Sequence, residues 1–200
     1  MAAVGATGLL VVTPYYNRPP QRGLLAHFRA VADATDLPVC LYDIPGRCGI
    51  PIETDTLIAL AEHPRIVAVK DAKADLFAAT KVMAATDLAW YSGDDVLVLP
   101  HIAQGAVGLI GVTTHLAGQK YAALIDAALA GRRQEAIALN RELIAVADAV
   151  MNTSQGAIMA KAGLVELGVI EHATVRLPLV ESTPEHLEKL RAGLAASGLA

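Results

Sequence analysis

The sequence predicts an α/β fold, because short apolar runs alternate with stretches that have the spacing of amphipathic helices. The runs are rich in β-branched residues and apolar on both faces, which is typical of parallel strands covered on both sides. Five runs occur in order, at residues 8–12, 39–42, 66–69, 88–91 and 108–112. Helix-like segments follow them at residues 20–35, 53–62, 74–86, 95–104 and 117–129. This alternation predicts parallel strands joined by right-handed crossovers.

After the fifth run the pattern changes to helix alone. Residues 117–168 have the pattern of successive helices. Thr183 followed by Pro184 is typical of the N-cap and first position of a last helix. We therefore expect a strand-bearing domain over residues 1–130 and a C-terminal helical extension over residues 131–200.

Composition excludes several classes of protein. Hydrophobic residues make up 54% of the chain and charged residues 18%, which excludes intrinsic disorder. A net charge of -4 disfavours a surface that binds nucleic acid or an anionic membrane. The chain has neither an apolar run of membrane-spanning length nor the basic start of a signal peptide. We expect a cytoplasmic protein in which Cys40 and Cys48, the only cysteines, are reduced.

Motifs for bound cofactors are missing from the sequence. No glycine-rich turn of the dinucleotide or P-loop kind follows any of the five runs. The six histidines are scattered, without the spacing of a metal site. No serine stands in a nucleophile-elbow context. We therefore expect neither a cofactor nor a metal ion, and small molecules as the binding partners.

Chemically capable side chains follow each expected strand. They lie in the segments at residues 13–17, 42–47, 70–71, 92–95 and 113–115. The carboxyl ends of parallel strands meet at one end of a sheet, and a (β/α)8 barrel builds its site there from several strands. The spacing by itself predicts only α/β architecture, and both a barrel and an open sheet remain possible.

Lys70 is the most informative single residue. It ends the apolar run at residues 66–69, and strand periodicity points it toward the interior or upper rim of a barrel. Burial of an ammonium group is unfavourable, so such a lysine tends to be neutral and nucleophilic. It can then attack a ketone and form an imine that acts as an electron sink. The alternative is a structural lysine that reaches solvent or pairs with Asp71 or Asp94.

Tyr42 and Arg47 form a second candidate element, at and just after the end of the second run. A tyrosine there can relay protons to and from an imine nitrogen and a leaving hydroxyl. An arginine can bind a substrate carboxylate through two parallel hydrogen bonds. The alternatives are a core tyrosine with a satisfied hydroxyl and an arginine in a surface ion pair.

Other candidates have equally plain alternatives. Tyr15 and Tyr16 are adjacent, so on a strand end their side chains face opposite ways. One could then enter a site while the other packs at an interface. The alternative is that both side chains make ordinary packing contacts. Gly93 would let a substrate approach the backbone closely. Asp94 or Asp95 is a candidate helix N-cap.

In combination these segments resemble the dihydrodipicolinate synthase family, which are (β/α)8-barrel, pyruvate-dependent class I aldolases of the N-acetylneuraminate lyase superfamily. The matching segments are GLLVVTPYYNRPPQ, LPVCLYDIPGRCGI, IVAVKDA, YSGDD and GAVGLIGV. The 28-residue interval from Tyr42 to Lys70 also fits the family. Any one segment alone would be a weak signal, whereas five in order are specific and span most of the chain.

The resemblance implies condensation of pyruvate with aspartate semialdehyde through a lysine Schiff base, in lysine and diaminopimelate biosynthesis. Lys70 matches the imine-forming lysine and Tyr42 the tyrosine that relays protons at the imine. Tyr16 matches a second relay tyrosine contributed across a subunit interface, and Tyr15 its interface neighbour. The family is usually a homotetramer, a dimer of dimers, so the resemblance implies a homo-oligomer.

Substrate-binding positions also follow from the resemblance. Arg47 matches the arginine that binds the semialdehyde carboxylate, and Gly93 and Ile110 match backbone positions that line the pyruvate pocket. Related N-acetylneuraminate and keto-sugar-acid lyases generally lack that arginine. Arg47, together with the pair Tyr15 and Tyr16, therefore favours the semialdehyde as the second substrate.

One family segment does not occur in these residues. It is Gly-Thr-Thr-Gly-Glu, whose threonine completes the relay between the two tyrosines and helps bind the pyruvate carboxylate. We expect the chain to hold the last five βα units of the barrel, strands four to eight, plus the C-terminal helices, without the N-terminal third. Two alternatives remain: a related lyase for a different aldehyde, and a non-catalytic remnant.

Overall fold

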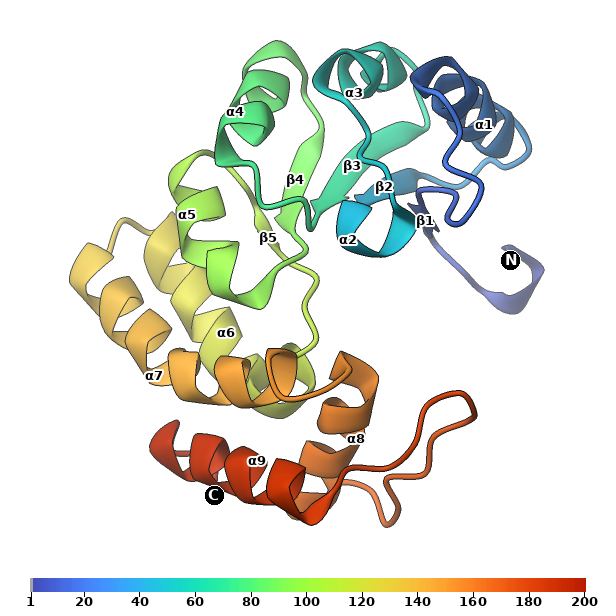
Figure 1. The fold of residues 1–200 in the computed structure, drawn as a ribbon. Coiled ribbons are helices and arrows are strands. Elements are labelled where there is room, and N and C mark those ends of the chain that lie inside the picture. Colours follow the sequence, from blue (N-terminus) through green and yellow to red (C-terminus); the bar gives the residue numbers. More distant parts are fainter. Residues whose placement is uncertain (1) are drawn as a thin grey trace. The chain divides into compact units, whose positions relative to one another are not determined.

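A computed structural model describes residues 2–200, and the chain divides into two compact units, Met1–Leu109 and Ile110–Ala200 (Figure 1). The first unit contains every strand, and the second is helical. The expected division at residue 130, between a barrel part and an extension, stays a prediction.

Strands and helices alternate through the first unit. Its elements in chain order are η1 (Ala2–Val4), β1 (Leu9–Val12), α1 (Gln21–Asp33), β2 (Val39–Asp43), α2 (Pro45–Cys48), α3 (Thr54–Ala61), β3 (Ile66–Asp71), α4 (Leu76–Ala85), β4 (Ala89–Ser92), η2 (Asp95–Leu97), α5 (Val98–Ala103) and β5 (Gly108–Leu109). The five expected strands and the helices between them are therefore present.

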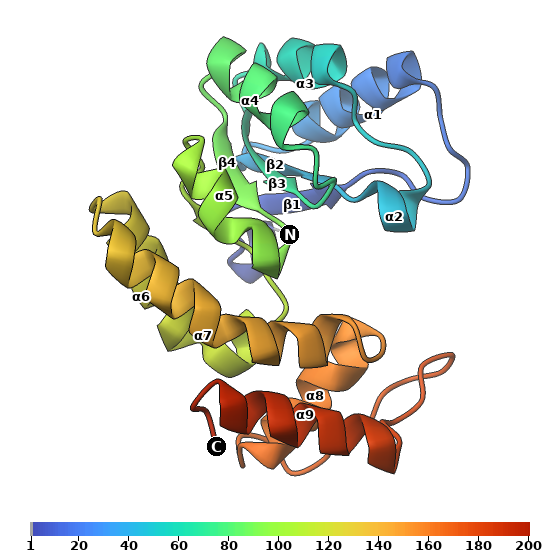
Figure 2. The same cartoon turned by 60° about the vertical axis from the view of Figure 1, so that its left-hand side comes forward.

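All strands are parallel, and their order in the sheet is their order in the chain. Helices α1, α3 and α4 lie on one face of this sheet (Figure 2). Val11, Leu41, Val69 and Trp90 share one register position on that face and belong to the main apolar core or pack against it. Because side chains alternate along a strand, the neighbouring residues point to the other face.

That other face carries one row of residues across the whole sheet. Val12, Tyr42, Lys70, Tyr91 and Gly108 are successive register partners from β1 to β5. The row lies toward the carboxyl ends of the strands, which is where parallel sheets build their sites.

The second unit is built from four helices. They are α6 (Thr114–Leu129), α7 (Arg133–Met151), α8 (Gly156–Glu166) and α9 (Pro184–Ala196). The expected run of helices is therefore confirmed. So is the N-cap, because Thr183 accepts a hydrogen bond from the backbone N–H of His186 in a capping box. Among residues 2–200 no single helix is long and apolar enough to cross a membrane; α7 and α8 meet that criterion only when taken together, across a bend of 117°.

Two local expectations have definite outcomes. The fifth strand is only Gly108–Leu109, shorter than the expected 108–112, and Gly108 and Gly111 give this segment little strand propensity. Cys40 and Cys48 are both free, as expected.

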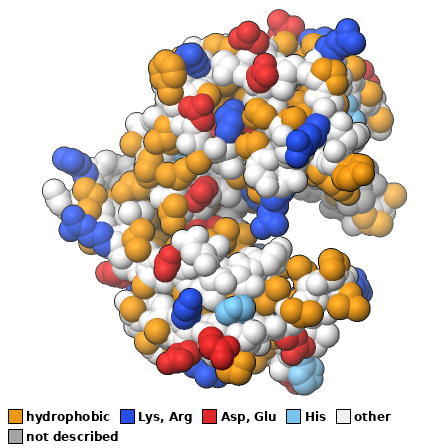
Figure 3. Space-filling model, viewed as in Figure 1, with side chains coloured by type: hydrophobic (Ala, Val, Ile, Leu, Met, Phe, Trp, Pro, Cys, Tyr) orange, Lys and Arg blue, Asp and Glu red, His pale blue; other side chains and the backbone are white. Residues whose placement is uncertain are grey.

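Over the face drawn in Figure 3, acidic, basic and hydrophobic side chains are interspersed, without a large patch of one charge.

Candidate active site

Lys70 and Tyr42 form the centre of the candidate site. They are register partners on β3 and β2, and the Lys70 Nζ lies 4.0 Å from the centroid of the Tyr42 ring. Lys70 is only 9% exposed. The parallel register therefore brings together the two residues that the sequence assigned to imine chemistry.

The surroundings of Lys70 favour the neutral amine. Burial lowers the pKa of Lys70, and the Asp95 carboxylate opposes that effect. Asp95 is 2% exposed. Burial likewise raises the pKa of Cys40 to about 11, so this thiol is neutral at physiological pH. The net effect on Lys70 is a larger fraction of nucleophilic amine than an exposed lysine has.

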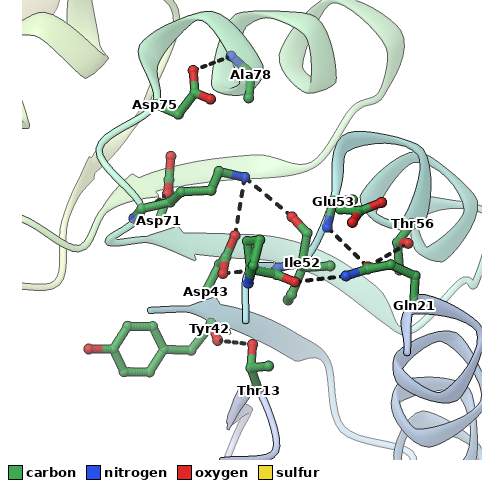
Figure 4. Close-up of polar contacts among 12 residues, drawn as sticks. Thr13, Gln21, Tyr42, Asp43, Ile52, Glu53, Thr56, Asp71, Asp75 and Ala78 are labelled. Carbon is green, nitrogen blue, oxygen red and sulfur yellow. Dashed lines mark hydrogen bonds and ion pairs between the residues drawn. The ribbon is translucent and has the colours of Figure 1, made fainter. Parts of the chain in front are cut away.

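Tyr42 is held by its backbone and keeps its phenol protonated. Its carbonyl oxygen accepts hydrogen bonds from the backbone N–H and the Oγ1 of Thr13, each 3.0 Å long (Figure 4). Burial raises the pKa of Tyr42, and the Arg47 charge acts in the opposite direction. Arg47 is exposed on α2, close enough for its charge to act on the phenol. A protonated phenol beside an amine can donate a proton to a leaving hydroxyl.

A buried polar layer begins one residue further along both strands. Asp43 and Asp71 are register partners, each 1% exposed, on the face opposite Tyr42 and Lys70. The Lys73 Nζ lies 3.2 Å from the Asp43 Oδ2 and donates to the Ile52 carbonyl oxygen at 3.2 Å. Figure 4 shows this group beside β2, with the Tyr42 ring leaving the strand on the other side.

Asp71 also faces a buried histidine on α5. The Asp71 Oδ2 and the His101 Nε2 are 3.6 Å apart, and neither atom has a hydrogen-bond partner in the part of the chain described. Burial raises the pKa of Asp71 and lowers the pKa of His101, while each group partly offsets the shift of the other. Burial thus favours an uncharged imidazole here.

Tyr15 and Tyr16 lie at the surface of the first unit. Tyr15 is 69% and Tyr16 94% exposed. Tyr16 also has a backbone φ of 67°, in the left-handed region that a bulky residue seldom adopts. A strained, fully exposed tyrosine is unusual, and such strain is frequent at functional sites.

Gly93 has a structural reason to be glycine. Its N–H donates to the Asp71 carbonyl oxygen at 2.7 Å. A Cβ at this position would lie 3.0 Å from the Ala72 nitrogen, the Ala72 Cβ and the Asp71 carbonyl carbon. The close approach is therefore made by the end of β3, next to Lys70.

The remaining sequence candidates have simpler positions. Asp94 is the N-cap of η2, accepting from the Val96 N–H at 3.0 Å, which confirms a cap in this segment. Ile110 begins the second unit and is half-buried. Its place beside the pyruvate pocket stays a prediction.

One cavity in the first unit lies at the wrong end of the sheet for this chemistry. It has a volume of about 480 Å³ and is lined by residues that include Glu62, His63, Ile66 and Asp87. Ile66 is the first residue of β3, whereas Lys70 is next to its last. The candidate site is therefore defined by its side chains and not by this cavity.

Comparison with known proteins decides the family. The model of the dihydrodipicolinate synthetase family matches residues 1–197. The chain belongs to the dihydrodipicolinate synthetase family. This confirms the resemblance drawn from the five sequence segments.

Relatives and solved structures of the family agree with this result. The chain is 57% identical over 194 residues to 4-hydroxy-tetrahydrodipicolinate synthase of Acidothermus cellulolyticus, covering 97% of this chain and 62% of the relative. The enzyme of Cyanidioschyzon merolae, solved with lysine bound, is 40% identical with a TM-score of 0.95 and is matched over 100% of this chain and 68% of its own. The chloride-inhibited enzyme of Acinetobacter baumannii, complexed with pyruvate, is 36% identical with a TM-score of 0.94 and the same coverage. The chain spans 62–65% of the length of the first relatives it matches.

For this member of the dihydrodipicolinate synthetase family, sequence reasoning missed one buried group. Lys73 was not among the sequence candidates, yet its side chain is only 12% exposed and is paired with the buried Asp43. Lys73 follows a strand end in a polar segment, which is typical of a surface lysine. The missed signal was the acidic residue directly after each of Tyr42 and Lys70, since two carboxylates at strand ends need a positive partner if they are buried.

Proposed function

We propose that this chain provides the imine-forming part of a 4-hydroxy-tetrahydrodipicolinate synthase, a lyase of lysine and diaminopimelate biosynthesis. The reaction would condense pyruvate with aspartate semialdehyde and release water. The observation that carries the proposal is the buried Lys70 amine, 4.0 Å from the Tyr42 ring centroid, in a chain of this family.

Lys70 supplies the nucleophile. Its neutral amine attacks the ketone carbon of pyruvate, giving a carbinolamine. Tyr42 donates a proton to the departing hydroxyl, which leaves as water, and the nitrogen lone pair forms the protonated imine. The Tyr42 ring face then lies against a cation, an arrangement that attracts positive charge. Pyruvate bound to the Acinetobacter baumannii relative supports this choice of first substrate.

The protonated imine prepares the second half of the reaction. It withdraws electrons, so that the methyl carbon of pyruvate loses a proton and becomes an enamine. The enamine carbon attacks the aldehyde carbon, and the aldehyde oxygen takes up a proton. The amino group of the semialdehyde then displaces Lys70 at the imine carbon, which closes the ring and frees the enzyme. Holding both reactants in one site makes these steps effectively intramolecular.

Arg47 is proposed to bind the carboxylate of the semialdehyde. It is exposed on α2, and its charge acts on the Tyr42 phenol, so a carboxylate held there would lie near the proton relay. Backbone at Gly93 and Ile110 is proposed to line the pyruvate pocket. Glycine at position 93 allows the close approach of the end of β3, and the absence of a Cβ would also allow a substrate to approach the backbone. The two roles are therefore compatible.

The five parallel strands are proposed to be consecutive units of a (β/α)8 barrel, strands four to eight. The sheet order equals the chain order, and α1, α3 and α4 cover a single face. Doubly wound open sheets reverse their strand order and carry helices on both faces, so this arrangement favours the barrel. Residues 1–130 would then be the barrel part and residues 131–200 its helical extension.

The proposed assembly is a homotetramer in the cytoplasm, a dimer of dimers. Tyr15 and Tyr16 are the candidates for its interface, because they expose large aromatic surfaces that protein contacts commonly cover. Tyr16 would act as the second relay tyrosine in the neighbouring subunit. Its left-handed backbone, at a φ of 67°, supports a functional reason for its position.

Trapping the imine tests the proposal directly. The chain is incubated with pyruvate, reduced with borohydride and mapped by peptide mass spectrometry, with Lys70→Met and the exposed-site variant Lys81→Met as controls. We expect one pyruvyl adduct, on Lys70, which persists in Lys81→Met and is lost in Lys70→Met. An adduct on another lysine would refute the assignment of the nucleophile. No adduct, where a full-length relative is labelled, would identify the chain as a non-catalytic remnant.

A further inference from the structure

Two buried carboxylates lie directly beyond the Lys70–Tyr42 pair. Asp43 and Asp71 are register partners at the ends of β2 and β3, and each is 1% exposed. Like charges opposite each other on neighbouring strands repel, and a buried carboxylate is unfavourable without compensation. The spacing of the two strand ends therefore depends on what offsets these charges.

Lys73 contacts both carboxylates. Its Nζ lies 3.2 Å from the Asp43 Oδ2, and its backbone N–H donates to the Asp71 Oδ1 at 2.9 Å. The same Nζ donates to the Ile52 carbonyl oxygen at 3.2 Å, and the Ile52 N–H donates to the Asp43 Oδ1 at 3.1 Å (Figure 4). One lysine thus joins both strand ends to the segment that leads into α3.

We propose that Lys73 is a positioning residue for the Lys70–Tyr42 pair. Its ammonium offsets the repulsion between Asp43 and Asp71 and so holds β2 against β3 one residue beyond that pair. This rests on the proposed function, because the positioned amine is the one that would form the imine.

The influence passes through the strands and not through contact with a substrate. Lys73 bonds to the face of the sheet opposite Lys70, because adjacent strand residues point to opposite faces. The β2–β3 register is irregular between Val39 and Cys40, toward the amino ends of the strands. From Cys40 to Asp43 the pairing with β3 is regular, and the Ala72 N–H donates to the Asp43 carbonyl oxygen at 2.8 Å, so the Lys73 bridge acts together with backbone pairing at the carboxyl ends.

The remaining charges near the bridge are acidic apart from one histidine. Glu53, Asp55 and Asp75 line a cavity of about 320 Å³ together with Lys73. On α5, His101 faces Asp71. The groups that act on Lys70 itself are Asp95, Cys40 and the Tyr42 ring.

Loss of the Lys73 charge should therefore make Lys70 harder to deprotonate. The unbalanced carboxylates favour the Lys70 ammonium, and separation of the strand ends exposes that ammonium to water. Both effects raise the pH at which Lys70 becomes reactive.

Trace acetylation with acetic anhydride measures that pH without pyruvate. The extent of Lys70 acetylation is followed by peptide mass spectrometry from about pH 6 to about pH 11, a range that includes the ordinary lysine value. For Lys73→Met we expect the midpoint to rise by about 0.5–1 pH unit. Lys73→Arg keeps the charge, and Lys81→Met changes an exposed lysine on α4, so both should keep the wild-type midpoint.

Two further variants distinguish the effect of the Lys73 bridge from nonspecific destabilisation of the strand ends. Asp43→Asn removes one carboxylate and leaves Lys73 in place, so its midpoint should lie at or below that of wild type. The double variant Asp43→Asn, Lys73→Met removes both ends of the bridge. Its Lys70 acetylation midpoint should return most of the way from the Lys73→Met value to the wild-type value.

An unchanged Lys70 acetylation midpoint in Lys73→Met would overturn the proposal. An equal rise of that midpoint in Lys73→Met and in Asp43→Asn would overturn it as well. If Lys73→Met does not fold, a midpoint above wild type in Asp43→Asn alone overturns it. Absence of a pyruvyl adduct refutes only the proposed function, because acetylation remains readable in that case.

Discussion

The Lys70 Nζ lies 4.0 Å from the centre of the Tyr42 ring because the two residues occupy the same register position of adjacent parallel strands. Neither residue needs a loop to reach the other. Sites built on regular elements hold their geometry more closely than sites on loops. The pair is therefore a rigid feature of the sheet, and several consequences can be measured.

Removal of the Tyr42 hydroxyl should slow imine formation without altering Lys70. In Tyr42→Phe the ring still covers the amine, so the Lys70 acetylation midpoint should stay at its wild-type value. The carbinolamine then loses its proton donor, and the rate of borohydride-trappable adduct formation should fall by about 10²-fold or more. A wild-type rate of adduct formation in this variant would show that Tyr42 is not the relay.

A methyl group at position 93 should disturb the end of β3. Its Cβ would lie 3.0 Å from backbone atoms of Asp71 and Ala72, which cannot move independently of Lys70. We expect Gly93→Ala to lower the free energy of unfolding by about 1–3 kcal/mol and to slow adduct formation.

Gly118→Ala is the matched control for Gly93→Ala. A Cβ at Gly118 meets nothing within 4 Å, and the residue lies within α6. Gly118 directly follows the kink at Ala117, so the helix-interior preference for alanine acts only in part and the free energy of unfolding should change by less than about 1 kcal/mol. Urea unfolding of both variants measures the difference, and equal stability would contradict the close approach at Gly93.

Stability should depend on pH through Asp43. Burial raises the pKa of Asp43 to about 6, against the opposing charge of Lys73. The unfolded carboxyl titrates at about 3.9, so between these values the folded chain holds a proton that the unfolded chain releases. The contribution of Asp43 to stability is therefore fully present below about pH 4 and is lost as the pH rises through about 6.

Urea unfolding of wild type and Asp43→Asn across this range isolates that contribution. We expect the free energy of unfolding of wild type, relative to the variant, to fall by on the order of 2 kcal/mol from acid to neutral pH. An increase toward neutral pH would show instead that the ion pair with Lys73 outweighs the effect of burial.

Local patterns predict the strands and Lys70, whereas pairing across strands decides what surrounds them. The apolar run before Lys70 and its strand-end position are visible in the sequence. The bridge from Lys73 to Asp43 depends on register and on a turn back toward Ile52, and neither has a local signature. The role of Gly93 beside a substrate stays a prediction, and the structure adds a second reason for glycine that depends on the neighbouring strand, because the end of β3 lies where a Cβ would be.

Helix packing in the second unit makes a prediction that is independent of catalysis. A Cβ at Gly193 of α9 would meet the Ala149 Cβ at 2.6 Å and the Ala145 carbonyl oxygen at 2.8 Å, on α7. At Gly163 the three atoms nearest to a Cβ all belong to the Leu116 side chain, which can change rotamer, whereas backbone atoms cannot move in this way. Gly193→Ala should therefore cost about 1–3 kcal/mol, more than Gly163→Ala, in urea unfolding. The reverse order would contradict the α7–α9 packing.

Arg47 should decide the second substrate and leave the first unaffected. Its guanidinium can bind a carboxylate through two parallel hydrogen bonds, so Arg47→Ala should raise the KM for aspartate semialdehyde by about 10–100-fold. Pyruvyl adduct formation at Lys70 should persist, because the imine forms before the aldehyde binds. Arg22→Ala, an exposed arginine on α1, is the matched control and should change neither. Loss of the pyruvyl adduct in Arg47→Ala would assign this residue to the pyruvate step, and an unchanged KM would favour a related lyase with a different aldehyde.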